Sequence, residues 1–278
     1  MRERHILGIS GGRDSAALAV YMRETHPELD IEYFFTDTGK ELEEVYRFLD
    51  RLEGFLGKTI TRLNPDRDFE FWLREYNHFL PSPRTRWCTR QLKLRPLEQW
   101  LRPDLDAGVV VNSYVAIRAD EPHREGYQAT HENMRVHLPL REAGIDRAGV
   151  IETLVSAGVG EPEYYSWRSR SGCTFCFFQQ KIEWVRLSRE HPDAFEEAKQ
   201  FEKTALSHGS PFTWSQGESL DDIAQPERVA EIEREFEARR QRQQAKRKVN
   251  PLAGDVPPSI DELYGIDEAS GGCVVCHK

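Results

Sequence analysis

The first residues able to do chemistry form a short run of glycine, serine and charged side chains: Ser10, Gly11, Gly12, Arg13, Asp14 and Ser15. An apolar run precedes it and a helix-forming stretch follows it. Two adjacent glycines let the backbone approach a phosphate closely, and amides at a helix start attract anions. The two serines add hydroxyl donors and the arginine adds a positive charge. The run therefore predicts a polyphosphate-binding loop.

Asp14 is unusual in such a loop, because a carboxylate repels a bare phosphate. Its presence makes sense if Mg²⁺ lies between the carboxylate and the phosphate, since Mg²⁺ prefers oxygen ligands. The competing interpretation is an ordinary Gly-Gly turn that carries an exposed Arg-Asp pair.

Cysteine spacing gives a second candidate site. Cys173 and Cys176 form one C-x-x-C pair, Cys273 and Cys276 form another, and Cys88 lies apart. The C-x-x-C spacing lets both sulfurs face one metal ion. Tetrahedral zinc held by the two pairs is one prediction from this pattern. The simplest interpretation of Cys88 is a small, buried, apolar side chain without a metal.

Two stretches around these cysteines contain no Asp or Glu, namely residues 76–97 and 164–182. The whole chain has a net charge of −9, which argues against a uniformly basic nucleic-acid coat. Local positive charge among aromatic side chains suits a nucleic-acid backbone with a stacked base. A bound triphosphate explains the same arginines.

Apolar runs and helical periodicity alternate along the first half of the chain. Strands are predicted at residues 6–9, 31–35, 59–63, 109–117 and 136–140, with the last at a sheet edge because of Pro139. Helices are predicted at residues 15–22, 41–56, 181–189, 192–207 and 226–248. This alternation predicts a doubly wound, mostly parallel α/β sheet with a helical C-terminal region. Ligands on such sheets bind beyond the carboxyl ends of the strands.

The 278 residues divide in this interpretation into a nucleotide-binding α/β domain (1–160), a cysteine-containing helical region (161–249) and a flexible tail (250–278). No run approaches the ~20 apolar residues of a membrane span, and no signal-peptide pattern opens the chain. We therefore expect a cytoplasmic protein that has no membrane partner and keeps its cysteines reduced.

Several motifs in order resemble one enzyme superfamily. The first loop resembles the SGGxDS loop of the PP-loop ATP pyrophosphatases, with their adenine nucleotide alpha hydrolase-like fold. The motifs that resemble its phosphoadenylylsulfate (PAPS) reductase branch are the run 36–39 with Glu41 and Tyr46, the run 86–89 with Lys93 and Pro96, the loop 117–121, and the run 169–176. Ala116 replaces the glycine that opens the third of these motifs. The chain is most similar to the DndC-like proteins of DNA phosphorothioation, including the SspD type.

This resemblance implies an enzyme that splits ATP between its α and β phosphates and adenylylates a substrate. It implies nucleotide contacts at Asp37, Thr38, Gly39 and Arg118, with Arg118 stabilising the pyrophosphate. An ordinary turn aspartate and a surface salt bridge are the simpler roles of Asp37 and Arg118. The substrate would be nucleic acid, DNA ahead of tRNA, and a cysteine desulfurase would donate the sulfur.

The motif order places Cys88 at the same end of the sheet as the first cysteine pair. Cys88, Cys173 and Cys176 then suit a [4Fe-4S] cluster with one iron free to hold sulfide, and Cys273 or Cys276 is a candidate fourth ligand. Three rival functions remain open: a thiol-dependent PAPS or adenylylsulfate reductase, a tRNA thiolase, and a zinc-clipped nucleotide-binding module. The reductases end in E-C-G-x-H and commonly lack the loop aspartate, so Asp14 favours ATP splitting.

Overall fold

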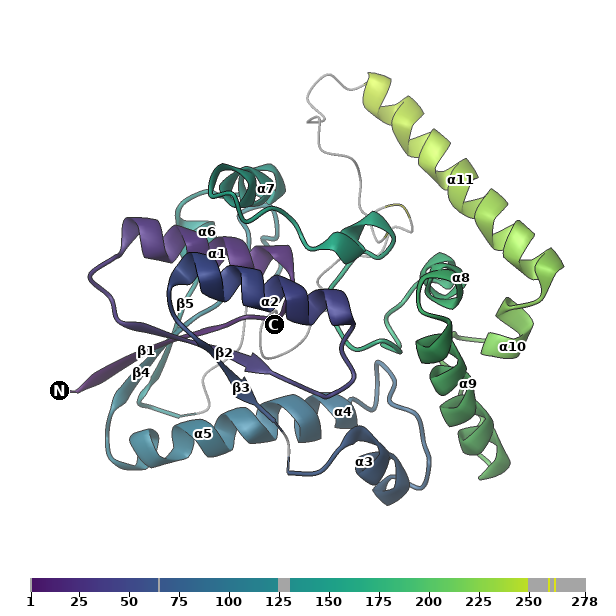
Figure 1. Cartoon of the computed structure of the whole chain (residues 1–278), viewed down its shortest axis with the longest axis horizontal. Helices are drawn as coiled ribbons and strands as arrows, with labels where there is room; N and C mark the ends of the chain where they lie inside the picture. The colour runs from purple at the N-terminus through teal and green to yellow at the C-terminus, as the bar shows by residue number, and fades with distance from the viewer. Residues whose placement is uncertain (1, 65, 125–130, 250–259, 261–262, 264–278) are drawn as a thin grey trace.

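A five-stranded parallel sheet forms the centre of the molecule (Figure 1). The structure is a computed structural model, and it describes all residues except 1, 65, 125–130, 250–259, 261–262 and 264–278. The strands are β1 (Glu3–Gly8), β2 (Ile31–Thr36), β3 (Ile60–Leu63), β4 (Val110–Tyr114) and β5 (Met134–His137). Their order is β3-β2-β1-β4-β5, and every neighbouring pair is parallel. The predicted doubly wound α/β class is confirmed.

Helices cover both faces of the sheet (Figure 1). On one face lie α1 (Arg13–Thr25), α2 (Glu43–Leu56), α6 (Pro139–Glu142) and α7 (Arg147–Ser156). The other face carries α5 (Arg95–Asp106), whose Leu97 and Leu101 pack against Ile6, Phe34 and Val111. Strand side chains alternate between the two faces, so a buried sheet needs an apolar layer on each side.

Two short helices and a π-helical turn lead into α5. They are α3 (Phe69–Glu75), α4 (Trp87–Thr89) and the π-helix η1 (Arg90–Leu94). The sequence prediction left this stretch without any helix. The leucines of α5 repeat with helical spacing, but the π-helical turn interrupts the period and Pro96 and Pro103 obscure it.

The C-terminal region is helical, as predicted. It contains the 3₁₀ turn η2 (Glu163–Ser166), α8 (Lys181–Glu190), α9 (Pro192–Ser207), α10 (Leu220–Ile223) and α11 (Pro226–Val249). Glu202 connects α9 to the segment that follows it, because its carboxylate accepts hydrogen bonds from the backbone amides of Trp214 and Leu220. Residues on both sides of position 160 share one apolar core, and the division into domains stays a prediction.

The fifth predicted strand needs a correction at its end. β5 is an edge strand, as Pro139 indicated, but it stops at His137. Pro139 and Leu140 belong to α6, where proline occupies the first turn. Proline is favoured there because the first helical amides have no acceptor within the helix.

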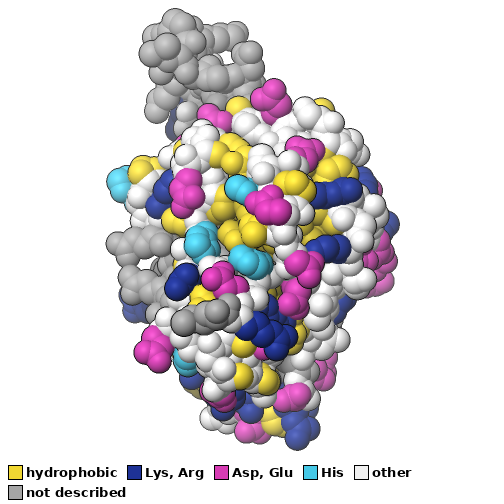
Figure 2. Space-filling view, turned by 90° about the vertical axis from the view of Figure 1, so that its left-hand side faces the viewer, with side chains coloured by type: hydrophobic (Ala, Val, Ile, Leu, Met, Phe, Trp, Pro, Cys, Tyr) yellow, Lys and Arg dark blue, Asp and Glu magenta, His cyan; other side chains and the backbone are white. Residues whose placement is uncertain are grey.

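Charged side chains of both signs mix on the face that bears the amino ends of the strands (Figure 2). On this face the positive and negative side chains are interspersed, in keeping with the net charge of −9. Within the described part of the chain, no helix combines the length and the apolar composition that crossing a membrane requires.

Candidate nucleotide and thiol site

The predicted phosphate loop lies between the carboxyl end of β1 and the first residue of α1. Gly11 has a φ of 76°, and a Cβ atom there would lie 2.6 Å from Cγ1 of Val45 on α2. Both observations require glycine at this position. Gly12 is the N-cap residue of α1, and it has no side chain that could cap the first amides of the helix. The sequence therefore builds an anion-binding turn at the expected edge of the sheet.

The two serines of the loop hold its shape. The Ser10 amide donates to Oγ of Ser15 at 3.0 Å, and the two hydroxyl oxygens are also 3.0 Å apart. Oγ of Ser15 in turn donates to the carbonyl of Gly12 at 3.1 Å. These bonds orient both serines inside the loop.

Asp14 and Arg118 form a buried ion pair. Nη1 of Arg118 lies 2.8 Å from Oδ2 of Asp14, and the two side chains are 4% and 12% exposed. Oδ1 of Asp14 is buried and has no hydrogen-bond partner. A desolvated carboxylate oxygen without a donor is costly unless a cation or donor meets it. The orphaned oxygen therefore fits a Mg²⁺ ligand beside the phosphate loop.

A second group of acids holds Arg118 in place. Nε of Arg118 donates to Asp120 at 2.9 Å, and its backbone amide donates to Glu121 at 3.1 Å. Burial raises the pKa of Glu121, against the charges of Arg118 and Arg124. The loop after β4 thus fixes the guanidinium that faces Asp14.

Tyr164, Tyr165 and Ser171 cover the phosphate loop, and the sequence prediction missed this contact. The Tyr164 hydroxyl donates to the Gly11 carbonyl at 2.8 Å, and the Arg13 amide donates to the Tyr165 hydroxyl at 3.4 Å. A Cβ atom on Gly12 would lie 3.0 Å from Oγ of Ser171. The one signal in the sequence was the aromatic, acid-free run that begins at Tyr164.

The Arg13 side chain turns away from the loop that it belongs to. Its Nη1 lies 3.0 Å from Oε1 of Glu161, and its guanidinium stacks on the Tyr165 ring at 4.4 Å. Arg13 thus offers the loop a backbone amide, while its charge lies toward η2. The contact between its guanidinium and a phosphate stays a prediction.

The turn after β2 forms the second wall. Asp37 accepts hydrogen bonds from the Gly39 amide and from the Tyr46 hydroxyl, each at 2.8 Å. Thr38 donates to Oε1 of Glu41 at 2.9 Å. Burial raises the pKa of Glu41, whose other carboxylate oxygen has no partner. Asp37 is therefore held by the Gly39 amide of its own turn and by Tyr46 of α2, and its charge acts on Glu41.

The first cysteine pair lies against this same turn. Cys173 bridges the backbone of Glu41, and the Thr174 amide donates to the Lys40 carbonyl at 2.7 Å. The side chain of Arg168 donates to the Cys173 carbonyl at 2.8 Å. The 169–176 loop is thereby fixed beside the turn after β2 and above the phosphate loop.

The three described cysteine thiols influence one another. A hydrogen bond from Cys173 lowers the pKa of Cys176 to about 6, and the charges of Arg168 and Arg170 act in the same direction. Burial raises the pKa of Cys88 to about 12, with a further contribution from Cys176. Cys88 therefore lies in the neighbourhood of the pair, as the motif order predicts.

These thiols do not form a ready metal site. Among the described residues, no three His, Cys, Asp or Glu side chains come together as a group that could hold a metal ion. Cys273 and Cys276 lie outside the described residues. The cluster and zinc predictions therefore stay predictions.

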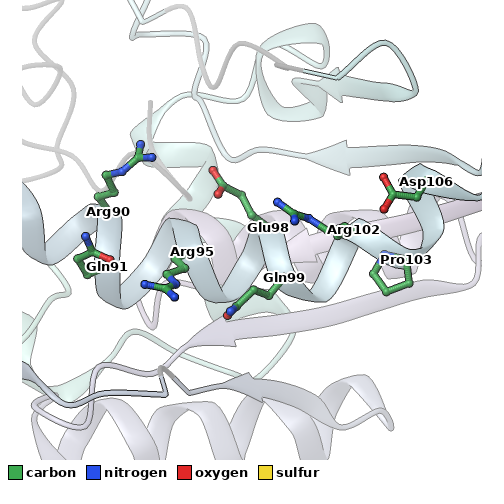
Figure 3. Close-up of a pocket in the computed structure, with 8 residues that line it drawn as sticks. All are labelled: Arg90, Gln91, Arg95, Glu98, Gln99, Arg102, Pro103 and Asp106. Atoms are coloured by element: carbon green, nitrogen blue, oxygen red, sulfur yellow. The ribbon is translucent and has the colours of Figure 1, made fainter.

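Among the residues that the structure describes, none of the predicted site residues lines a large hollow elsewhere on the protein. It has a volume of about 610 Å³ and runs along η1 and α5, where Arg90, Arg95 and Arg102 alternate with acidic and amide side chains (Figure 3). Its described lining residues come from one continuous helical stretch. This described lining brings together no groups from different elements, so the phosphate loop remains the candidate site.

Residues 4–137 match the sequence model of one protein family. It is the phosphoadenosine phosphosulfate (PAPS) reductase domain. The matched segment is slightly less than half of the chain, and it contains the phosphate loop, the turn after β2, Cys88 and Arg118.

Two uncharacterised proteins of Methanocaldococcus jannaschii are similar in sequence. One is 26% identical over 69% of this chain, and the other is 22% identical over 67%. The chain covers 40% and 44% of their respective lengths, so it spans less than half of either relative. Among solved structures, a PAPS reductase from Candida auris in complex with phosphate matches 61% of this chain and 81% of its own. That match has 15% identity and a TM-score of 0.48.

Proposed function

We propose that the protein is an ATP pyrophosphatase of the DndC/SspD type. It adenylylates a nucleic-acid substrate for sulfur insertion, and DNA phosphorothioation is the reaction that we favour. The observation that carries the proposal is Asp14, buried at the start of α1 with one oxygen paired to Arg118 and the other orphaned. Reduction of an activated sulfate offers no role for this carboxylate, whereas a Mg²⁺-bound triphosphate does.

The geometry of the loop supports ATP as the proposed ligand. The amides at the start of α1 and the serine hydroxyls would hold the phosphates, with Gly11 providing the turn. Asp14 would hold Mg²⁺, which supplies charge neutralisation for the phosphate oxygens. Arg118 lies beside this carboxylate and would stabilise the charge that develops on pyrophosphate.

In the adenylylation step, an oxygen of the nucleic acid attacks the α-phosphorus of ATP. A new O–P bond forms, the bond between the α-phosphorus and the bridging oxygen breaks, and pyrophosphate leaves with the electron pair. Sulfur at the oxidation level of sulfide then takes the place of AMP, which leaves with the former oxygen. The protein contributes positioning and charge stabilisation, which supply most of the acceleration in such transfers.

A cysteine desulfurase would be the source of the sulfur and would pass it on as a persulfide. A thiol reductant would then supply the two electrons that release the sulfur as sulfide near Cys88, Cys173 and Cys176. A [4Fe-4S] cluster on these thiols is our proposal for the carrier, with zinc as the alternative. Support comes from three thiols that influence one another's pKa values beside the phosphate loop. The described side chains are not gathered into a metal-binding group, so no step above depends on the cluster.

A thiol-dependent PAPS or adenylylsulfate reductase is the second candidate. The match of residues 4–137 to the PAPS reductase domain favours it, and so does the lowered pKa of Cys176, because a thiolate is the nucleophile in such chemistry. A reductase would consume no ATP and would release sulfite.

The experiment measures pyrophosphate release from ATP under anaerobic conditions, with no substrate, with DNA and with tRNA. Release that depends on DNA supports the proposal, and release that depends on tRNA reassigns the protein to tRNA thiolation. Sulfite production from PAPS without pyrophosphate release would replace the proposal with the reductase. ATP binding without release under every condition would leave a nucleotide-binding module.

A further inference from the structure

A second cavity adjoins the phosphate loop on the side toward α11. It has a volume of about 550 Å³ and lies among the starts of α1 and α7, the 165–169 segment, α8 and α11. Arg13 and Tyr165 of the loop region line it. Within the described chain, its lining includes none of the other residues predicted to contact nucleotide. The cavity is therefore a neighbour of the ATP site and distinct from it.

The cavity is strongly basic. Its described lining contains five arginines, at positions 13, 147, 168, 186 and 240, and a single glutamate, Glu161. Glu161 pairs with Arg13 at 3.0 Å, and Arg240 pairs with Glu237 of its own helix at 3.2 Å. In a chain with a net charge of −9, this concentration of guanidinium groups favours an anionic ligand.

Two buried polar side chains on the cavity wall have unmet hydrogen-bonding capacity. Arg168 is 1% exposed, and its two terminal nitrogens donate to the carbonyls of Gly172 and Cys173 while its Nε has no partner. Ser169 is 8% exposed, and its Oγ has no partner. N–H and O–H donors are the groups that phosphate oxygens accept from. Buried donors without acceptors are costly, which favours a ligand that supplies the acceptors.

Two arginine–aromatic stacks complete the cavity. The Arg13 guanidinium lies 4.4 Å from the centre of the Tyr165 ring, and that of Arg186 lies 4.7 Å from the centre of the Phe236 ring. Both pairs line the cavity, one at α1 and η2 and the other at α8 and α11. Flat aromatic and guanidinium surfaces are the platforms on which nucleic-acid bases stack.

We propose that this cavity binds one nucleotide unit of a single-stranded nucleic acid, with its phosphodiester at Arg168 and Ser169. The base stacks on one of the two arginine–aromatic platforms. The assignment rests on the proposed function, which supplies the nucleic-acid substrate. It places the reacting strand next to Arg13, the residue that joins this cavity to the phosphate loop. DNA and RNA share the chemistry recognised here, and the test separates them.

The test measures the affinity of the full chain for short single-stranded DNA and RNA of the same sequence by fluorescence anisotropy. Arg240→Glu and Gln244→Glu place a negative charge on the α11 wall of the cavity. Arg242→Glu is the matched control, because two residues along a helix turn the side chain about 200° to the far side. Arg240 is 52% exposed, so its replacement leaves the core intact.

We expect Arg240→Glu and Gln244→Glu to weaken binding of the oligonucleotide about three- to tenfold at low salt. Arg240→Glu should also reduce the slope of log affinity against log salt by about 1, since it removes a positive charge from the cavity wall. Affinity for ATP should not change in either variant. The oligonucleotide that binds with the higher affinity, DNA or RNA, identifies the kind of strand that the cavity binds.

Absence of oligonucleotide binding by the wild type, or equal loss in Arg242→Glu, would overturn the cavity as a nucleic-acid site. The proposed function fails by a different result. Oligonucleotide binding that depends on Arg240, without any release of pyrophosphate, would support the cavity as a nucleic-acid site and would contradict the proposed pyrophosphatase activity. Pyrophosphate release, together with oligonucleotide binding that neither Arg240→Glu nor Gln244→Glu weakens, would support the pyrophosphatase activity and would contradict the cavity as the nucleic-acid site.

Discussion

At the scale of single residues, Gly11 shows how little freedom the phosphate loop has. Its positive φ and the nearby Val45 side chain forbid any Cβ atom. We expect Gly11→Ala to lower the free energy of unfolding by about 2–4 kcal/mol, combining backbone strain with overpacking. Gly57→Ala is the control, since Gly57 also has a positive φ but no atom within 4 Å of its Cβ position. Urea denaturation should show a clearly smaller loss for the control, and equal losses would contradict the steric account.

Glu41 is the buried acid between the turn after β2 and the cysteine loop. Burial raises its pKa, so the folded state holds the proton more tightly than the unfolded chain does. Its contribution to stability is therefore fully present below the unfolded pKa and is lost as pH rises through the folded pKa.

We expect the stability of the wild type to fall relative to Glu41→Gln as pH rises from about 4.3, the ordinary pKa of glutamate, toward neutrality. Denaturation of both proteins across this range checks the sign. A wild type that gains stability relative to Glu41→Gln over the same range would show that Lys93 and Arg168 outweigh burial.

Sequence reasoning at the residue scale reached the loop residues because their chemistry is local. The Ser10 to Ser15 run and the C-x-x-C pair carry their geometry in consecutive positions. The contacts of Tyr165 and Ser171 with the loop were not predicted. The partners are more than 150 residues apart in the sequence, and their contact depends on how η2 packs. The direction of the Arg13 side chain was not predicted for the same reason, because its distant ion-pair partner Glu161 determines it.

At the scale of elements, the segment from η2 to Ser171 acts as a cover on the phosphate loop. The Tyr165 hydroxyl occupies the Arg13 amide, which a phosphate oxygen would also use. We expect Tyr165→Phe to bind ATP up to about fivefold more tightly, because a hydrogen bond of at most about 1 kcal/mol no longer competes.

Tyr164→Phe is the matched control for the cover, because the Tyr164 hydroxyl donates to a carbonyl and leaves the amides alone. Its ATP affinity should stay at the wild-type value in a calorimetric titration. Weaker binding by Tyr165→Phe would contradict the competition and would make the hydroxyl a ligand contact.

The elements themselves were predictable to different degrees. Strands and helices with one clear period, such as β2 and α9, were placed within a residue or two. The stretch from α3 to α5 was not, because a π-helical turn shifts the leucine spacing and prolines suggest breaks. Cys88 lies directly before that turn, so its position relative to the pair needed the structure.

At the scale of the whole molecule, three segments far apart in sequence converge on one edge of the sheet. The phosphate loop, Cys88 and the 169–176 loop come from different elements, and the turn after β2 lies between them. This convergence is what the parallel topology produces, since all strands end at the same edge.

The cysteines allow a test of the predicted carrier on the full chain. Iron, zinc and sulfide analysis of anaerobically purified protein should give iron with sulfide, and Cys88→Ser should lose the iron. Zinc without sulfide, retained in Cys88→Ser and lost in Cys273→Ser, would favour the two-pair zinc site. Protein that contains no metal would contradict both the iron–sulfur and the zinc predictions and would favour free-thiol chemistry at Cys176.

The central claim is that the Asp14 and Arg118 pair serves a Mg²⁺-bound triphosphate at the loop, and pyrophosphate release tests it most directly. With ATP, Mg²⁺ and single-stranded DNA, we expect release by the wild type and at least a hundredfold less release by Asp14→Asn. Asp50→Asn is the control, because the Asp50 side chain on α2 is 68% exposed, and its release should equal that of the wild type. Equal release by wild type and Asp14→Asn, or none by the wild type while PAPS yields sulfite, would contradict the account.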